Sequence, residues 1–371
     1  MTNFPIREQP MVRDLDQIEE YAARYRVPKE DVGMIALNAS GVKAGDTLVD
    51  RGRFKVTFPE SMRTYFSALT LTSNAFSPFE HLGDHMTLDG QYFADTTEII
   101  PDTCTDTYWR DGTKALTINT NSRANCHGCM FCGTYSLEND ESKPLLTLDL
   151  LRAKAEELCK DTPTGDLSEV EKVGVVTGCF PNQLKLGAHL SLIRQAFSEY
   201  GFAGELQYVG SQLRDEQIIR GLLSEGDLSL YITLEAFTRR TMLMKRTKSS
   251  LTLDDAVELM GTAKDAGADT SYLYIAGLDP LDDMEREMPR FNDVLTRMPN
   301  IQIFQAYTPD QLPILQPDAQ RLDYFLQARE IAESAYPELR PIPALNFRSL
   351  WYTAYRGMML PDTANTIETV G

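Results

Sequence analysis

The sequence predicts an α/β fold: a full or partial (β/α) barrel of the triosephosphate-isomerase (TIM) type with an N-terminal α+β extension. Two observations support this prediction. From residue 115 onward, strand-like apolar segments alternate with helix-like amphipathic segments, a pattern typical of parallel β/α units joined by right-handed crossovers. Residues 1–108 instead have the pattern of one helix followed by short alternating stretches. We therefore divide the chain into an N-terminal extension, 1–108, and a β/α barrel core with a C-terminal extension, 109–371.

The N-terminal extension begins with an amphipathic helix near 14–26, whose apolar stripe comprises Leu15, Ile18, Ala22 and Tyr25. Alternation over 54–58 predicts a strand, and turn signals follow at Asp89-Gly90 and Asp111-Gly112. Two roles are open for the extension. It is either a lid over an active site or a packing or dimerisation segment, and terminal segments more often only pack.

The barrel core contains apolar segments with the length and composition of strands. Strands are predicted at 115–120, 173–177, 205–210, 228–234, 270–276 and 301–306, with a further candidate at 341–345. Helices are predicted between them at 147–160, 187–200 and 213–224, and then from Thr252, which caps a helix that Gly267 ends. A doubly wound open sheet would show the same alternation. In both architectures the chemistry lies at the C-terminal ends of the strands.

Composition narrows the class of protein. The chain of 371 residues has 54 acidic and 36 basic residues, a formal net charge of −18 that disfavours nucleic acids and anionic membranes as partners. No apolar run is long enough to span a membrane, and the N-terminus lacks a basic region followed by an apolar stretch. We therefore expect a cytoplasmic protein. In a reducing compartment, crowded cysteines favour metal ligation or redox chemistry.

Three cysteines are crowded into seven positions directly after the predicted strand 115–120. Cys126, Cys129 and Cys132 have the spacing C-x2-C-x2-C, which lets three thiolates point at one centre. Soft sulfur ligands select zinc or iron–sulfur clusters. Three ligands leave one iron of a four-iron cluster open, and an open position is typical of a catalytic rather than a structural metal site.

Two other interpretations of these cysteines stay open. A structural zinc site would need a fourth ligand, from His127, Cys104, Cys159, Cys179 or elsewhere, and no second C-x2-C pair exists. A ferredoxin-like electron carrier would add a fourth cysteine a few residues on, and none follows. We therefore expect a catalytic iron–sulfur site, with a zinc-stabilised binding protein or an electron-transfer protein as alternatives.

The strand, the cysteine loop with Phe131 just before the third cysteine, and the β/α units that follow resemble the radical SAM superfamily. The usual spacing there is C-x3-C-x2-C; here Asn125 lies where the first cysteine would be, so the first spacer is one residue short. The resemblance implies a [4Fe-4S] cluster on the three cysteines, with S-adenosyl-L-methionine (SAM) chelated at the open iron. It also implies reductive cleavage of SAM to a 5′-deoxyadenosyl radical, which abstracts hydrogen from the substrate, and an electron donor of the flavodoxin or ferredoxin type.

The same resemblance implies SAM-binding residues after the second and fourth barrel strands. Thr177-Gly178 stands where the family has a Gly-Gly-Glu-like turn, although Cys179 replaces the second glycine. Cys179 is either a reactive or ligand thiol or a small buried residue. Glu235 matches a strand-ending glutamate that would contact the SAM ribose or amino group, and an ion pair with Arg239 or Arg240 is the alternative.

Three further residues are implied to contact SAM. Arg246 matches a basic position that pairs with the SAM carboxylate, and a solvated helix face is the alternative. Ile275 and Gly277 would flank the adenine, unless they simply end a core strand. Asp279 could replace the glutamate that ends this family pattern.

The substrate is expected to be a small molecule, such as a metabolite, an amino acid or a natural-product precursor. The acidic charge argues against RNA, and no second cysteine-rich cluster follows, as relatives that act on peptides often have. Polar residues at or beyond predicted strand ends are pocket candidates, namely Gln207, Tyr208, Ser211, Gln302, Gln305, Tyr307, Asn346 and Arg348. The reaction subtype (lyase, mutase or transferase) stays open.

Overall fold

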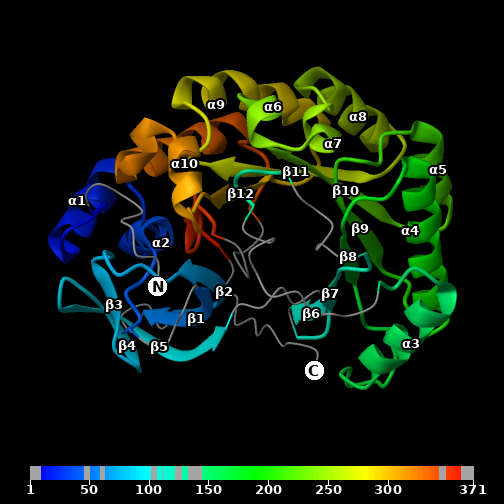
Figure 1. Cartoon of the computed structure of the whole chain (residues 1–371), viewed down its shortest axis with the longest axis horizontal. Coiled ribbons are helices and arrows are strands. Elements are labelled where there is room, and N and C mark those ends of the chain that lie inside the picture. The colour runs from blue at the N-terminus through cyan, green and yellow to red at the C-terminus, as the bar shows by residue number, and fades with distance from the viewer. Residues whose placement is uncertain are drawn as a thin grey trace.

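Two β-sheets organise the protein, and Figure 1 shows how they are arranged. The computed structural model describes residues 10–45, 51–58, 63–101, 107–110, 112–121, 128–132, 144–341 and 348–360. A five-stranded antiparallel sheet has the order β2-β1-β5-β4-β3, and a seven-stranded sheet has the order β12-β11-β10-β9-β8-β7-β6. The larger sheet is curled into a half-barrel with helices on its convex side (Figure 1). The predicted α/β class is therefore confirmed, with a half-barrel as its form.

The first sheet lies in the N-terminal part of the chain. Its elements are α1 (Leu15–Tyr25), α2 (Lys29–Ser40), β1 (Arg51–Phe58), β2 (Arg63–Thr72), β3 (Phe79–His81), β4 (His85–Leu88) and β5 (Gln91–Pro101). Helix α1 is the predicted amphipathic helix, capped by Asp14 and burying Ile18. Asp89 and Gly90 form the predicted turn between β4 and β5, and both have positive φ, as tight hairpin turns require. Helix α2 is buried almost all round, so it has no polar stripe from which to predict it.

The half-barrel contains six parallel strands in sequence order and one antiparallel edge strand. They are β6 (Thr107–Arg110), β7 (Ala115–Ile118), β8 (Lys172–Val176), β9 (Glu205–Gly210), β10 (Leu228–Glu235), β11 (Asp269–Ala276) and β12 (Asn300–Ile303), with β6 antiparallel to β7. A doubly wound sheet reverses its strand order at a switch point, and this sheet does not. Of the predicted candidate at 341–345, residues 342–345 lie outside the described residues.

Helices and 3-10 turns follow the strands of this sheet from β7 onward. The helices are α3 (Leu148–Cys159), α4 (Gln183–Ser198), α5 (Glu216–Ser224), α6 (Arg240–Leu243), α7 (Arg246–Ser249), α8 (Leu253–Asp265), α9 (Leu281–Glu287) and α10 (Leu322–Ala335), with 3-10 turns η4 (Met288–Val294), η5 (Pro309–Ile314) and η6 (Pro317–Gln320). Of these, η5, η6 and α10 come after β12, the last strand of the sheet. The predicted helices correspond to α3, α4, α5 and α8. Thr252 and Asp255 form a reciprocal capping box at the start of α8.

Side chains alternate between the two faces along each strand, so the convex and concave faces of the curled sheet can differ in polarity. On the convex face, Tyr272 packs against Phe291 of η4 and against Tyr336, which directly follows α10, with ring centroids 5.1 Å and 6.4 Å away. The apolar side chains Leu206, Leu230 and Ile232 are fully buried. Half-buried polar side chains such as Gln207 and Gln302 instead lie on the concave face.

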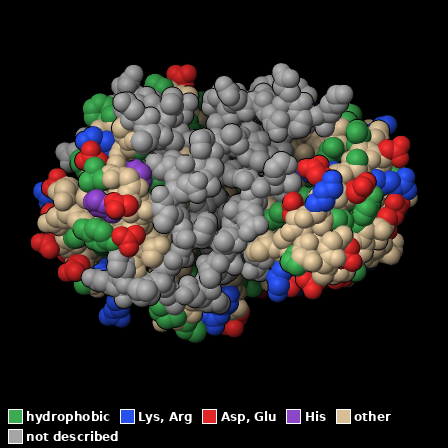
Figure 2. All heavy atoms as spheres, turned by 90° about the horizontal axis from the view of Figure 1, so that it is seen from below, with side chains coloured by type: hydrophobic (Ala, Val, Ile, Leu, Met, Phe, Trp, Pro, Cys, Tyr) green, Lys and Arg blue, Asp and Glu red, His purple; other side chains and the backbone are tan. Residues whose placement is uncertain are grey.

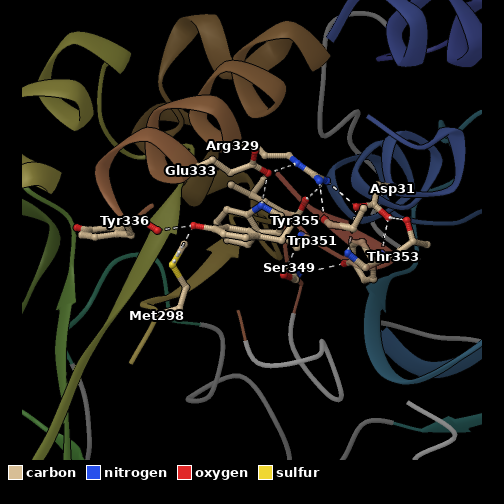
Figure 3. Close-up of polar contacts among 12 residues, drawn as sticks. Asp31, Met298, Arg329, Glu333, Tyr336, Ser349, Trp351, Thr353 and Tyr355 are labelled. Carbon is tan, nitrogen blue, oxygen red and sulfur yellow. Dashed lines mark hydrogen bonds and ion pairs between the residues drawn. The ribbon is translucent and has the colours of Figure 1, made fainter. Parts of the chain in front are cut away.

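A buried ion pair joins the N-terminal helix α2 to α10 and to the C-terminal segment 348–360. Arg329 donates to Asp31 over 2.5 Å and to the Ala354 carbonyl over 2.6 Å (Figure 3). The backbone N–H of Thr353 donates to the other oxygen of Asp31 over 2.6 Å. Buried charges are tolerated when they are paired and hydrogen-bonded, as these are. Helix α2 is thus packed into the same core as the half-barrel.

The C-terminal segment continues this core and ends in a small hairpin of β13 (Ala354–Tyr355) and β14 (Met358–Met359). On the face shown in Figure 2, acidic, basic and hydrophobic side chains are intermingled over the described residues. Among the helices of the described ranges, none has the length and apolar character needed to cross a bilayer.

Candidate metal centre and its surroundings

Two of the three predicted cysteine ligands lie close together after β7. Cys129 is buried and Cys132 half-buried, and the Cys132 N–H donates to the Cys129 carbonyl over 3.2 Å. Cys126 and His127 lie outside the described residues. Among the residues that the structure describes, no three His, Cys, Asp or Glu side chains converge on one point. The complete three-cysteine site therefore stays a prediction.

The cysteine loop packs against the chain that follows β10. The Met130 N–H donates to the Leu243 carbonyl over 2.9 Å, and Gln311 of η5 donates to the Met130 carbonyl over 2.9 Å. Gly128 has φ of 100°, and a Cβ there would lie 3.1 Å from the Cβ of Lys245. Phe131 is buried in the hydrophobic core. Residues 128–132 are thereby held against the chain that follows β10.

Glu235 ends β10 in an unusual backbone conformation. Its φ is 65°, in the left-handed region, and the pairing of β10 with β11 shifts register between Thr233 and Glu235. Its carboxylate is largely buried and accepts a hydrogen bond from the Lys248 ammonium over 2.6 Å. Non-glycine residues in this region cost about 1–3 kcal/mol and occur preferentially at functional sites.

The two arginines predicted as alternative partners of Glu235 bind backbone carbonyls. Arg240 donates to the carbonyls of Leu234 and Ala236 over 2.7 Å and 2.6 Å. Arg239 donates to the carbonyls of Leu278 and Ile314. Burial lowers the pKa of Arg240 to about 10. Both guanidinium groups therefore brace the loop after β10, and the ion pair of Glu235 is made by Lys248.

Lys248 pairs with Glu235 and is near enough to the cysteine loop for its charge to act on the thiols. Burial by itself would lower the pKa of Lys248, but the charges of Glu235, Cys129 and Cys132 raise it above its ordinary value. Burial likewise raises the pKa of the Cys129 thiol, and Lys248 opposes this shift. A buried ammonium beside two thiols suits a polyanionic ligand. Lys248 is not among the residues predicted from the sequence, because the single turn of α7 gives no periodic signal.

Arg246, the predicted partner of the SAM carboxylate, is exposed at the start of α7. Its neighbour Lys245 instead reaches toward the site, where its ammonium donates to Cys179 Sγ over 2.9 Å. Cys179 is half-buried, and Thr247 Oγ1 lies 3.8 Å from its sulfur. The thiol is therefore engaged by a cation at the end of β8.

Thr177-Gly178 lies at the predicted place, just beyond β8. The Gly178 N–H donates to the Asn121 carbonyl over 2.9 Å, and Asn121 Nδ2 donates to the Cys179 carbonyl over 3.1 Å. Thr177 Oγ1 is buried and has no hydrogen-bond partner among the described residues. The ends of β7 and β8 are thus tied together beside the cysteine loop.

Ile275 and Gly277 lie at the end of β11. Gly277 has φ of 113°, and a Cβ there would lie 3.0 Å from Phe304 Cβ and 3.4 Å from Leu315 Cδ1. Core side chains therefore lie close to Gly277. This agrees with the alternative that Gly277 simply ends a core strand. Ile275 is half-buried. Its role toward an adenine stays a prediction.

Asp279 is fully buried and serves the loop after β10. Its carboxylate accepts from the backbone N–H groups of Phe237 and Thr238 over 2.7 Å and 2.9 Å, and from the Tyr274 hydroxyl over 2.9 Å. The Thr238 hydroxyl also donates to it over 2.5 Å. Four hydrogen bonds within the protein give this carboxylate a structural function at the site.

The pocket candidates separate into distinct groups. Gln207 and Gln302 lie on the concave face, whereas the Tyr208 hydroxyl accepts from the Gln212 N–H and Ser211 is buried. Gln305 accepts from Thr72 over 2.8 Å and from Arg348 over 3.0 Å, which links the N-terminal sheet to the barrel end. The Arg348 guanidinium lies 5.5 Å from the Tyr307 ring centroid, and Asn346 is outside the described residues.

Comparison with known proteins finds a weak structural similarity. No model of a known protein family matches the sequence, and no curated protein is similar to it. Among solved structures, the chain is similar to the radical S-adenosylmethionine methyltransferase TsrM from Kitasatospora setae, solved with cobalamin and a [4Fe-4S] cluster bound. The TM-score is 0.38 at 12% identity, and the similarity covers 52% of this chain and 38% of the other. The chain thus spans well under half of that structure, and its function has to be argued from its own residues.

Proposed function

We propose that this protein is a radical SAM enzyme that holds a [4Fe-4S] cluster on Cys126, Cys129 and Cys132 and acts on a small molecule. The observation that carries the proposal is the packing of the cysteine loop after β7 against the chain after β10, beside Glu235 and Lys248. When bound, the cluster and SAM supply reductive cleavage to a 5′-deoxyadenosyl radical, which removes hydrogen from the substrate. The protein binds, orients and shields these groups.

The residues of the loop suit such a cluster. Cys129 and Cys132 provide two soft ligands within one turn of chain, in a partly buried setting that limits access of water. Lys248 places one positive charge beside them. Thiolate ligation makes a cluster site strongly negative, so a buried ammonium stabilises it.

Glu235 supports a cofactor site at the end of β10. Its left-handed backbone is held by Arg240, which binds the carbonyls on either side of it. The surrounding structure therefore fixes a strained residue whose carboxylate faces the chain beside the cysteine loop. A carboxylate in this position can accept hydrogen bonds from the amino group or the ribose hydroxyls of SAM.

The test is anaerobic reconstitution with iron and sulfide, followed by visible spectroscopy and by reaction with dithionite and SAM. We expect about four irons per chain, absorbance typical of an iron–sulfur cluster, and release of 5′-deoxyadenosine. Cys126→Ser, Cys129→Ser and Cys132→Ser should each lose most of the iron. Cys159→Ser is the matched control for Cys129→Ser, because Cys159 is as buried as Cys129 but lies in helix α3.

Other results would assign another function. A cluster that never cleaves SAM would indicate an electron-transfer protein, and a colourless protein with stoichiometric zinc would indicate a zinc-stabilised binding protein. If Cys179→Ser loses as much iron as Cys129→Ser, then Cys179 is a fourth protein ligand of the cluster. The cluster would then lack the open position on which SAM binding depends.

A further inference from the structure

The concave face of the half-barrel carries a band of uncharged polar side chains. Thr233 of β10 lies beside Leu273 of β11, and Leu273 lies beside Asn300 of β12 in the register of the sheet. Gln302 follows Asn300 by two residues and therefore points to the same face. Gln207 of β9 lies beside Ser229, which is four residues before Thr233 and shares its face. We call Gln207, Thr233, Asn300 and Gln302 the amide–hydroxyl band.

The band points away from the helices. Tyr272 and Tyr274 flank Leu273 in the sequence and so occupy the opposite face of β11. Tyr272 contacts Phe291 and Tyr336 in the helical layer, so the face that carries Leu273 is the concave one. Gln207, Asn300 and Gln302 are only partly buried, which leaves their amides accessible from the inside of the half-barrel.

Charged groups lie on both sides of the band, but they pair with one another. At the N-terminal ends of the strands, Lys172 lies 3.4 Å from Glu205, and Arg297 donates to Glu205 and to Asp269. Two cations and two carboxylates therefore neutralise each other there. At the C-terminal end, Glu235 pairs with Lys248. Among the described residues, the zone between them carries the amide–hydroxyl band and Leu273, and the charges at its two ends are paired.

Two atoms of the band are buried without a partner. Thr233 Oγ1 and Asn300 Oδ1 make no hydrogen bond within the described residues, and Thr233 is only 6% exposed. A buried polar atom without a partner costs about 1–3 kcal/mol, so such atoms in a native protein call for an explanation. A bound molecule that donates and accepts hydrogen bonds would satisfy both atoms.

We propose that the amide–hydroxyl band binds an uncharged, hydroxyl-rich part of the substrate, such as a sugar, polyol or nucleoside. Hydroxyls both donate and accept, as the Thr and amide side chains of the band do. The charged side chains described at the two ends of the zone already pair with one another, so a charged group here would be expensive to bury. The assignment of this molecule as the substrate rests on the proposed function, but its binding needs no cluster.

The first test compares two threonine variants that differ only in hydrogen bonding. Thr270, on the helix-facing side of β11, is fully buried and donates to the Val294 carbonyl over 2.6 Å. Thr270→Val should lower the melting temperature, whereas Thr233→Val should leave it unchanged or raise it. An equal loss in both variants would show that the Thr233 hydroxyl is already satisfied, and would overturn the proposal.

The second test measures binding to the full-length chain by ligand-observed NMR. The probes are N-acetylglucosamine and uridine, each paired with its phosphate, N-acetylglucosamine 6-phosphate and uridine 5′-phosphate. We expect at least one uncharged probe to bind, its phosphate to bind more weakly, and Thr233→Val and Asn300→Leu to weaken binding at least tenfold. Thr270→Val should retain that binding.

Three results would overturn the proposal: no uncharged probe binds, the phosphates bind as tightly as their parents, or Thr233→Val weakens SAM binding as much as it weakens the uncharged probe. The last result would assign the band to the ribose of the cofactor. Iron content and 5′-deoxyadenosine release are measured separately on the wild-type chain. If the proposed function is wrong, these two measurements on the wild type will show it, whether or not the probes bind.

Discussion

The ammonium of Lys248 lies 2.6 Å from the carboxylate of Glu235 at the mouth of the half-barrel. The two side chains are 19% and 10% exposed, so both charges have lost most of their hydration. Each of them therefore depends on the other, because a buried charge that loses its partner is strongly unfavourable. This pair joins the end of β10 to the one-turn helix α7 beside the cysteine loop.

Replacing Lys248 with methionine should destabilise the protein by about 3 kcal/mol, because Glu235 would remain buried without its counter-charge. Urea denaturation measures this loss. The double variant Lys248→Met/Glu235→Gln should regain most of it, since both charges are then absent. If the single and double variants are equally unstable, the two side chains are not coupled as the geometry indicates.

Replacing Arg329 with methionine should loosen the junction between α2, α10 and the C-terminal segment. Asp31 would lose the guanidinium that lies 2.5 Å away, and we expect a loss of about 3–5 kcal/mol with faster amide exchange in α2 and in 348–360. Hydrogen-exchange mass spectrometry locates the change. Arg24→Met removes an exposed ion pair with Asp323 and should have a much smaller effect. Similar exchange in both variants would argue against the junction.

His189 should make the stability of the fold depend on pH. Burial lowers the pKa of His189 to about 4, below its ordinary 6.5, so the imidazole stays neutral beside Thr120 in the folded state. The unfolded chain takes up the proton below pH 6.5. The contribution of His189 is therefore complete above pH 6.5 and is lost as the pH falls toward 4, by about 3 kcal/mol.

Denaturation of the wild type and of His189→Gln at pH 7 and pH 4.5 isolates this contribution, since other groups titrate in both proteins. The wild type should lose more stability on acidification than the variant. Parallel losses in the two proteins would mean that the histidine is already accessible to protons in the folded state.

Alanine variants of Gly277 and Gly267 distinguish the cost of backbone strain from the cost of close packing. Both have positive φ, 113° and 103°, but an added Cβ would meet Phe304 only at Gly277. Gly267→Ala should cost about 1 kcal/mol from the backbone alone. Gly277→Ala should cost about 2–3 kcal/mol, because a crowded core must also shift. Chemical denaturation measures the loss of unfolding free energy in each variant. Equal losses in the two variants would indicate open space beside Gly277, which an adenine-binding role would require.

Much of the fold could be predicted because its signals are local. Helix caps such as Thr252, the alternation of strands and helices, and the spacing of Cys126, Cys129 and Cys132 all depend on residues a few positions apart. The buried helix α2 escaped prediction for the same reason, since it has no polar stripe to give it a period.

The sequence by itself determined the α/β class, the order of the barrel units and the predicted set of thiolate ligands, because backbone hydrogen bonding and periodicity are encoded locally. Only the tertiary structure decided that Lys248, rather than Arg239 or Arg240, pairs with Glu235, and that Asp31 pairs with Arg329 across 298 positions. These partners are chosen by the packing of separate elements, α7 beside the end of β10 and α10 against α2, which no short segment specifies.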